Sequence, residues 1–250
     1  MDTTKLPVSV AWTIGRILEP ALGRTQRPIQ IGSSVFDNCI HRYSLAHRAF
    51  HNLQHLEFVL THFRHSCPSA HPLHDLGLLA ILYHDCHVLS DGSVPTVLTP
   101  EACSAKAFVD ECAIPLALSE DDIKWVSDTI LATRTHDPTN DDTMDLILDG
   151  DLGALGFPRQ YYRQYCWQLY DEFVHGPLRV SERDFLLARL DFLKKFLGRP
   201  YIYTHSTNKE GVARHNMHFE ATDIEATLAM MEKTGRPLSE LGIWSGGRLA

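Results

Sequence analysis

The sequence predicts an all-α protein, and two observations support this. Apolar residues recur at three- and four-residue spacing along most of the chain, as on the buried face of a helix. No stretch alternates apolar and polar residues long enough to indicate a β-strand, and no internal repeat is present. The 250 residues, 44% of them hydrophobic, are enough to build a substantial core. We expect a single helical domain over residues 1–250, with a loose tail after about residue 235.

The first part of the chain predicts five helices separated by short connections. A helix start is expected where Ser119 precedes three acidic residues, because such residues cap and stabilise a helix N-terminus. Residues 88–100 contain Asp91-Gly92 and two prolines, which predicts a loop of the kind that borders active sites. The expected helices lie near residues 8–18, at 52–63, from Pro72 to Tyr83, at 101–108, and from 119 towards His136.

The second part predicts four further helices. Residues 145–155 combine leucines with two aspartates and indicate a buried helix, while residues 158–174 carry an aromatic stripe that is typical of core packing. Residues 181–197 and 209–233 follow the same apolar spacing. The Gly/Ser-rich residues 245–247 are expected in the tail.

Composition and charge exclude several classes of function. The net charge of −8 argues against a nucleic-acid-binding protein, whose contact surface must be positive. No run approaches the ~20 apolar residues of a membrane span, and residues 1–7 lack the pattern of a signal peptide. None of the six cysteines forms a C-x-x-C pair, so we expect reduced thiols in a cytoplasmic protein without membrane or nucleic-acid partners.

Histidine is unusually frequent: ten of the 15 lie between His41 and His87. His51 and His55 are four residues apart, so on a helix they share a face. His84 and Asp85 follow an apolar helix and are adjacent, about 100° apart around its axis, so an ion above the face between them could contact both. Imidazole and carboxylate groups together suit a borderline divalent metal.

Asp149 and Asp151 lie in a segment that is otherwise apolar, where an unpaired carboxylate is costly to bury. Binding a metal would remove that cost for one of them, as would a buried salt bridge. Each of these signals is weak alone, since an isolated histidine often lies on the surface without a functional role. Their order along the chain, with His136 between the second and third, makes a metal site between helices the favoured interpretation.

The ordered motifs resemble the HD superfamily of metal-dependent phosphohydrolases. They are most similar to a family of small predicted HD hydrolases that carry a Tyr-His-Asn-Leu-x-His motif. The resemblance covers about residues 40–220. The matching text is Tyr43-Ser44, Arg48 to His55, Tyr83-His84-Asp85, Glu101 to Ala105, Ile130, Thr133, His136, Leu148 to Leu152, Ile202-Tyr203 and Ala213 to Asn216.

The resemblance implies an HD-domain helical bundle and assigns a role to each motif residue. The metal ligands would be His55, His84, Asp85 and Asp151, with Asp149 as the less favoured choice for the fourth. His51 would donate a proton to the leaving oxygen, and Glu101 and His136 would act as base or as ligands to a second metal. Arg48 and Arg214 would bind phosphate, which suits a planar guanidinium.

The expected function is hydrolysis of a phosphate ester or anhydride in a nucleotide or other small phosphorylated metabolite. The cofactor would be one or two divalent ions per chain, with Mn, Fe, Zn, Co, Ni and Mg all compatible with the ligands. Two alternatives stay open: a di-iron oxygenase on the same fold, and a non-catalytic nucleotide or metal sensor. The phosphate loop, the H-E-x-x-H zinc helix and the G-x-S-x-G nucleophile turn are absent.

Overall fold

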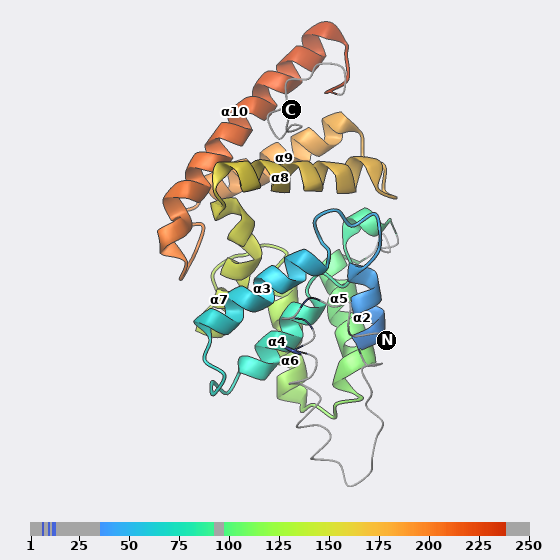
Figure 1. Cartoon of the computed structure of the whole chain (residues 1–250), viewed down its shortest axis with the longest axis vertical. Helices are drawn as coiled ribbons and strands as arrows, with labels where there is room; N and C mark the ends of the chain where they lie inside the picture. Colours follow the sequence, from blue (N-terminus) through green and yellow to red (C-terminus); the bar gives the residue numbers. More distant parts are fainter. Residues whose placement is uncertain (1–6, 8–9, 11, 14–35, 93–97, 239–250) are drawn as a thin grey trace. The chain divides into compact units, whose positions relative to one another are not determined.

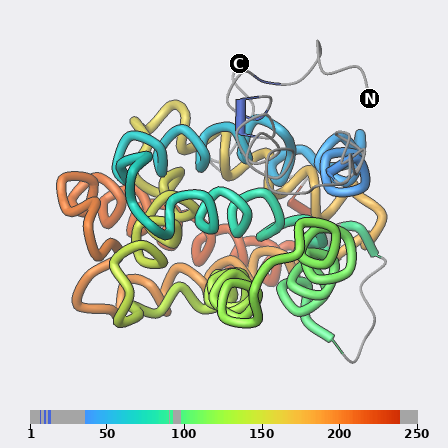
Figure 2. The backbone as a smooth tube through the Cα atoms, turned by 90° about the horizontal axis from the view of Figure 1, so that it is seen from below, coloured from blue at the N-terminus to red at the C-terminus, as the bar shows by residue number. Residues whose placement is uncertain are grey.

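The structure is a computed structural model that describes residues 7, 10, 12–13, 36–92 and 98–238. Within this part of the chain, helices account for all regular structure and no strand is present (Figure 1). The backbone trace likewise runs through helical turns and connecting loops (Figure 2). The predicted all-α class is confirmed.

The described residues group into two compact units, residues 1–151 and residues 152–250. The single domain predicted from the sequence is not tested by this grouping and stays a prediction. The first unit contains every motif from Tyr43 to Asp151. Its helices are α2 (Asp37–Tyr43), α3 (Leu53–Ser66), α4 (His74–Tyr83), α5 (Pro100–Phe108), α6 (Glu120–Ala132) and α7 (Asp142–Asp151), with a 3₁₀ turn at Leu89–Asp91 and a π-helical turn at Val109–Ala113.

Local sequence explains where these helices begin. The side chains of Asn52, Thr99 and Ser119 each accept backbone N–H groups of the following turn, so α3, α5 and α6 start at capped N-termini. Pro100 occupies the first turn of α5, where its missing N–H costs nothing. Acidic residues follow the cap of α6, as the sequence predicts, and complement the positive end of the helix dipole.

Helix α4 forms the centre of the first unit. All its residues from Gly77 to Tyr83 are buried, and it contacts α3, α5, α6 and α7. A helix that is apolar on every side requires neighbours on every side. Gly77 allows α3 to approach closely, because a Cβ at this position would lie 2.3 Å from Cζ of Phe63. This packing brings the C-terminal end of α4, and with it His84 and Asp85, towards the helices around it.

The second unit contains α8 (Arg159–Tyr170), α9 (Glu182–Leu197) and α10 (Glu210–Thr234), with a 3₁₀ segment at Leu152–Gly156. A buried ion pair joins α9 to α10, since Nε and Nη2 of Arg189 each lie 3.0 Å from an oxygen of Glu220. Tyr162 of α8 donates its hydroxyl proton to the same carboxylate. Asn216 donates to the carbonyls of Leu155 and Phe157.

The structure corrects several predicted boundaries. The buried helix expected at 145–155 is α7 followed by the 3₁₀ segment, and the helix expected at 158–174 changes to a π-helical turn at Asp171–His175. Residues 88–100 include a 3₁₀ turn before the undescribed residues 93–97. Helix α2 had no predicted counterpart. Most of the helix expected near residues 8–18, and the Gly/Ser-rich end, lie outside the described residues.

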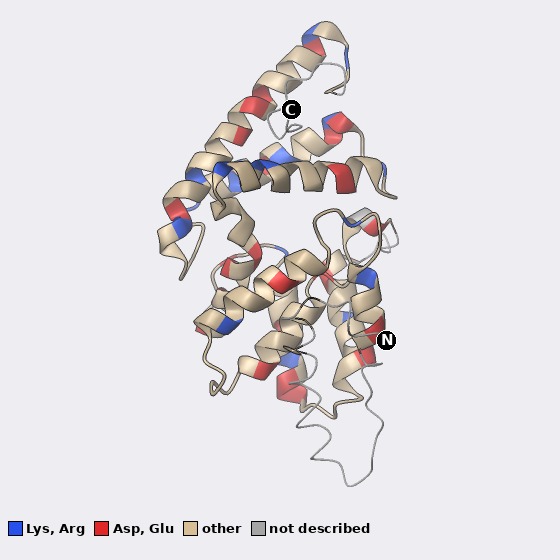
Figure 3. Ribbon diagram, in the orientation of Figure 1, with Lys and Arg blue, Asp and Glu red and all other residues tan. Residues whose placement is uncertain are grey.

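Basic and acidic residues are interspersed along the helices (Figure 3). Among the described helices, none has both the length and the apolar composition that crossing a bilayer requires. All six cysteines are buried and none is paired with another.

Candidate metal centre

The first expected ligand, His55, lies in the first turn of α3. The side chain of Asn52 caps this helix by accepting the backbone N–H groups of Gln54, at 2.8 Å, and of His55, at 3.4 Å. The cap therefore fixes the backbone of the ligand itself. The imidazole of His55 is buried, with its Nε2 atom directed towards α4 and α7.

His84 and Asp85 follow directly after α4. Nδ1 of His84 donates to the carbonyl of Ile81 at 2.7 Å, which leaves Nε2 facing the other candidate ligands. This arrangement is typical of metal-binding histidines, whose second nitrogen is held by a backbone or carboxylate oxygen. The backbone N–H of Asp85 donates to the hydroxyl of Tyr43 at 3.0 Å. Both residues of the pair therefore have fixed orientations.

The fourth candidate ligand, a second carboxylate, comes from the last residue of α7. Oδ1 of Asp151 lies 3.1 Å from Nε2 of His55 and 3.5 Å from Nε2 of His84. Asp149 is also buried, but it is not among the residues whose ligand atoms converge. Asp151, which the sequence analysis had favoured without excluding Asp149, is the aspartate of α7 that belongs to the group of side chains that could hold a metal ion.

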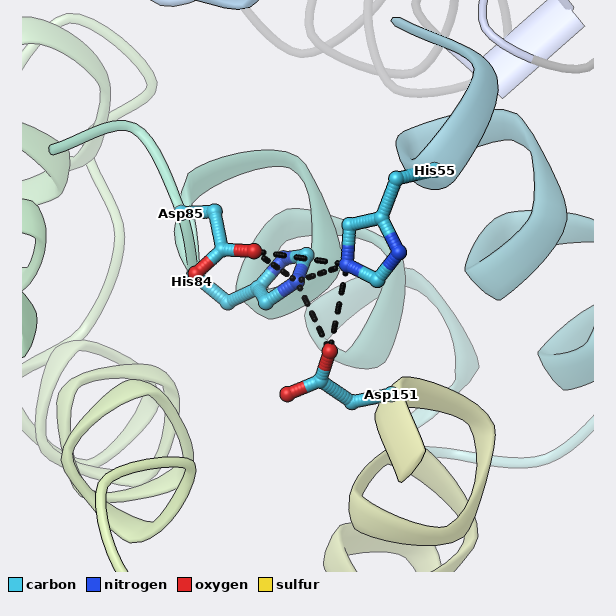
Figure 4. A group of neighbouring side chains, drawn as sticks. All are labelled: His55, His84, Asp85 and Asp151. Atoms are coloured by element: carbon cyan, nitrogen blue, oxygen red, sulfur yellow. Dashed lines mark hydrogen bonds and ion pairs between the residues drawn. The ribbon is translucent and has the colours of Figure 1, made fainter. Parts of the chain in front are cut away.

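The four side chains point towards one another (Figure 4). The Nε2 atoms of His55 and His84 are 3.2 Å apart. Oδ2 of Asp85 lies 3.3 Å from Nε2 of His55 and 3.1 Å from Nε2 of His84. All four ligand atoms lie within 4.8 Å of one another. Ligands ~2.1 Å from an ion are separated by about 3.0 Å at 90° and about 3.4 Å at 109°. The donor set and its spacing therefore fit one divalent metal ion.

The electrostatics of the four side chains also favour a cation among them. Burial opposes protonation of His84, but the carboxylates of Asp85 and Asp151 outweigh it and raise the pKa of His84 well above its usual value. Burial likewise opposes ionisation of both aspartates. The neighbouring histidines, His84 foremost, outweigh it and hold the pKa of each carboxyl well below its usual value. A positive charge among these four side chains therefore stabilises both carboxylates.

His136 lies beside the converging ligands and was expected there. Its Nε2 is 2.8 Å from Oδ2 of Asp151, the oxygen that does not face His55. His136 follows α6, and its N–H donates to the carbonyl of Ala132 while its φ is +51°. Such left-handed positions at helix C-termini usually hold glycine or asparagine. A histidine here costs backbone strain, as do Ala117 and Arg179, which have similar positive φ angles elsewhere in the described chain.

His51 and Glu101 have different surroundings. The ring of His51 lies 5.9 Å from that of His55. Burial raises the pKa of Asp85, and the charges of His84 and then of His51 oppose this effect and lower it. His51 therefore lies beside one of the four candidate ligands, and its expected role as a proton donor stays a prediction. Glu101 lies in the first turn of α5, with its Oε2 atom buried and without a hydrogen-bond partner. Its expected role as a base or ligand stays a prediction.

The two arginines expected to bind phosphate both bind protein groups. All five N–H groups of Arg48 have acceptors in the described part of the protein. Its expected role in phosphate binding stays a prediction. Arg214, in the second unit, pairs with Glu210 and donates to the carbonyls of Leu197, Arg199 and Pro200, beyond the end of α9. Its role in substrate binding stays a prediction.

The sequence analysis did not identify two contributors to the site. Tyr43, which it noted only as part of a motif, holds the backbone of Asp85. Asp91, which it placed in a loop, pairs with Arg48 and His47. The Asp91-Gly92 dipeptide predicted a turn, and nothing in its spacing indicates a partner more than forty positions earlier.

No protein-family model, no curated protein and no solved structure matches the chain. The candidate site therefore rests on its residues and their geometry.

Proposed function

We propose that this protein is a metal-dependent phosphohydrolase of the HD type. The observation that supports the proposal most strongly is the convergence of two imidazoles and two carboxylates from three separate helical segments, in the order of the HD motifs. A chance cluster of surface charges would not bury both histidines or orient His84 through Ile81. The proposed cofactor is one or two divalent ions, and the proposed substrate is a small phosphorylated metabolite such as a nucleotide.

Four residues would hold the ion: His55, His84, Asp85 and Asp151. When bound, a divalent ion in such a site lowers the pKa of water and offsets the negative charge of phosphoryl oxygens. The chain's own groups then position and transfer protons. Nε2–H of His136 donates a hydrogen bond to Oδ2 of Asp151 and so fixes the orientation of that carboxylate.

His51 is the proposed proton donor to the leaving oxygen. It lies beside the ligands without belonging to the four that converge, which is the position that an acid requires. Its ring lies 4.9 Å from that of Phe50, which contacts His55 as well. Replacing His51 with glutamine should lower kcat for substrates with poor leaving groups more than for nitrophenyl esters, which leave without a proton.

The test is release of phosphate from a panel of nucleotides and sugar phosphates, with each of several divalent metals added to protein freed of metal. Asp85→Asn keeps the side-chain shape and removes the charge, so we expect more than about a 100-fold loss of activity with the fold retained. Asp128→Asn is the matched control, because Asp128 is exposed on α6 and pairs only with Lys124 among the contacts described.

Equal activity of the Asp85→Asn variant and the wild type would refute the proposed mechanism. The alternatives predict other outcomes in the same experiment. A di-iron oxygenase would retain iron on purification and consume oxygen with the substrate. A sensor would bind a nucleotide or a metal tightly and release no phosphate under any of the metals.

A further inference from the structure

We propose that Arg48 is a positioning residue of the metal centre, holding the segment before His55 and the His84–Asp85 pair in one fixed arrangement. The inference rests on the proposed function, because it concerns the same site. It replaces the phosphate-binding role that the sequence suggested for this arginine. The argument depends on the partners of its guanidinium, on Tyr43 and on Asn52.

The guanidinium of Arg48 is fully buried and fully bonded. Its side chain is 0% exposed. Nη1 donates to the carbonyl of Asp85 at 2.8 Å and to that of His51 at 3.5 Å, and Nη2 donates to the carbonyl of Cys86 at 2.9 Å. The remaining bonds, from Nε at 3.0 Å and from Nη2, go to the two oxygens of Asp91. One side chain thus contacts three separate segments of the chain.

Asp85 is consequently held on both sides of its Cα atom. Its N–H donates to the hydroxyl of Tyr43, and its carbonyl accepts from Arg48. The guanidinium carbon of Arg48 also lies 5.6 Å from the centre of the Tyr43 ring, so the two residues that hold Asp85 also contact each other. Without these two hydrogen bonds, only α4 would hold the backbone of Asp85, which lies directly after the end of that helix.

The backbone of Arg48 is tied to the other ligand segment. Nδ2 of Asn52 donates to the carbonyls of Arg48, at 3.2 Å, and of Ala49, at 2.9 Å. Oδ1 of the same side chain accepts the N–H of His55. A continuous set of hydrogen bonds therefore runs from the backbone of His55, through Asn52 and Arg48, to the backbone of Asp85.

The carboxylate of Asp91 offsets the cost of burying the positive charge of Arg48. A buried arginine requires a counter-charge, and this carboxylate is 7% exposed and also bonds Nε2 of His47 at 2.8 Å. The planar fork of arginine can bond a carboxylate and three carbonyls at once. A lysine in its place offers three donors from a single point and cannot reproduce this set.

The expected consequence is weaker metal binding in the Arg48→Lys variant. Loss of a partner that orients a metal ligand typically lowers metal affinity 10- to 100-fold. The assay is titration of metal-free protein with Co²⁺, followed by visible absorbance, and with Mn²⁺, followed by calorimetry. The control is Arg189→Lys, which also removes a buried guanidinium from a carboxylate, in the second unit. Its affinity for both metals should equal that of the wild type.

Kinetics separate this role from phosphate binding. A positioning residue should raise the metal concentration needed for half activity and lower kcat, with KM for substrate little changed at saturating metal. A residue that binds phosphate would raise KM with unchanged metal affinity. If Arg48→Lys does not fold, Asp91→Asn keeps the shape of its partner and carries the same expectation.

The outcomes are distinct. Equal metal affinities in the wild type, Arg48→Lys and Asp91→Asn would overturn this inference and leave the proposed function intact. Metal binding by the wild type without hydrolysis of any phosphate would overturn the proposed function, and the affinity comparison would still decide the role of Arg48. A wild-type protein that binds no divalent metal would overturn both.

Discussion

The left-handed backbone of His136 allows a quantitative comparison of two variants. His136→Ala and His136→Gly both remove the imidazole and its hydrogen bond to Asp151, so these losses cancel between them. Only alanine retains a Cβ at φ +51°. A left-handed conformation destabilises a residue with a Cβ by about 1–2 kcal/mol. Glycine avoids this cost, but its greater freedom in the unfolded chain destabilises the glycine variant by roughly 0.5–1 kcal/mol. We therefore expect the glycine variant to be more stable by roughly 0.5–1 kcal/mol.

The assay is urea unfolding of both metal-free variants, with thermal unfolding as a second probe. For a chain of this length, 1 kcal/mol moves the melting temperature by about 2–4 °C, so the glycine variant should melt about 1–4 °C higher. Both variants should lose the proposed phosphohydrolase activity to the same extent, because both lack the imidazole. An alanine variant as stable as the glycine variant would show that the backbone at this position is not left-handed.

Three further predictions concern the metal centre and the core. A divalent ion at about 100 times its Kd should raise the free energy of unfolding of the wild type by about 2.7 kcal/mol, and that of Asp151→Asn by far less, as measured by urea unfolding. The pKa of His84 is raised in the fold, so its protonation stabilises metal-free protein below pH 6.5, and this stabilisation is lost as the pH rises through the higher folded-state pKa. Metal-free protein should therefore become less stable at alkaline pH, whereas the stability of metal-loaded protein should not change over the same range. Urea midpoints between pH 6 and 10 that run parallel in the two states would contradict this. Gly77→Ala should destabilise the protein by about 1–3 kcal/mol, because the new Cβ would overlap the ring of Phe63, and thermal unfolding without metal tests it.

Much of the helical framework could be predicted, because its signals are local. The apolar run of α4 indicates burial on every side, and Ser119 with its acidic followers indicates the start of α6. Helix α2 was missed because it has only seven residues, too few for the apolar spacing to repeat. The π-helical turns after α5 and α8 have no spacing signature that distinguishes them from ordinary helix.

The candidate ligands could be predicted because their residue types and order are informative. The choice between Asp149 and Asp151, however, depends on how the helices pack. Asp149 and Asp151 are about 200° apart around a helix, and leucines on both sides of the pair give no preference between them. Only the contact of α7 with α3 decides that Asp151 lies beside His55. Arg48 was assigned to phosphate because arginine commonly binds it, whereas its acceptors in the structure are three backbone carbonyls and the carboxylate of Asp91, which no sequence pattern displays.

The separation of the ligands along the chain has a consequence for folding. An ion bound by all four would close two loops, one from residue 55 to residue 84 and one from residue 85 to residue 151, in the manner of a cross-link. Closing long loops reduces the freedom of the unfolded chain more than closing short ones. Removing the ion with a chelator should therefore also increase the frequency with which α3, α4 and α7 unfold together. Amide hydrogen exchange in these three helices should then become faster to the same extent.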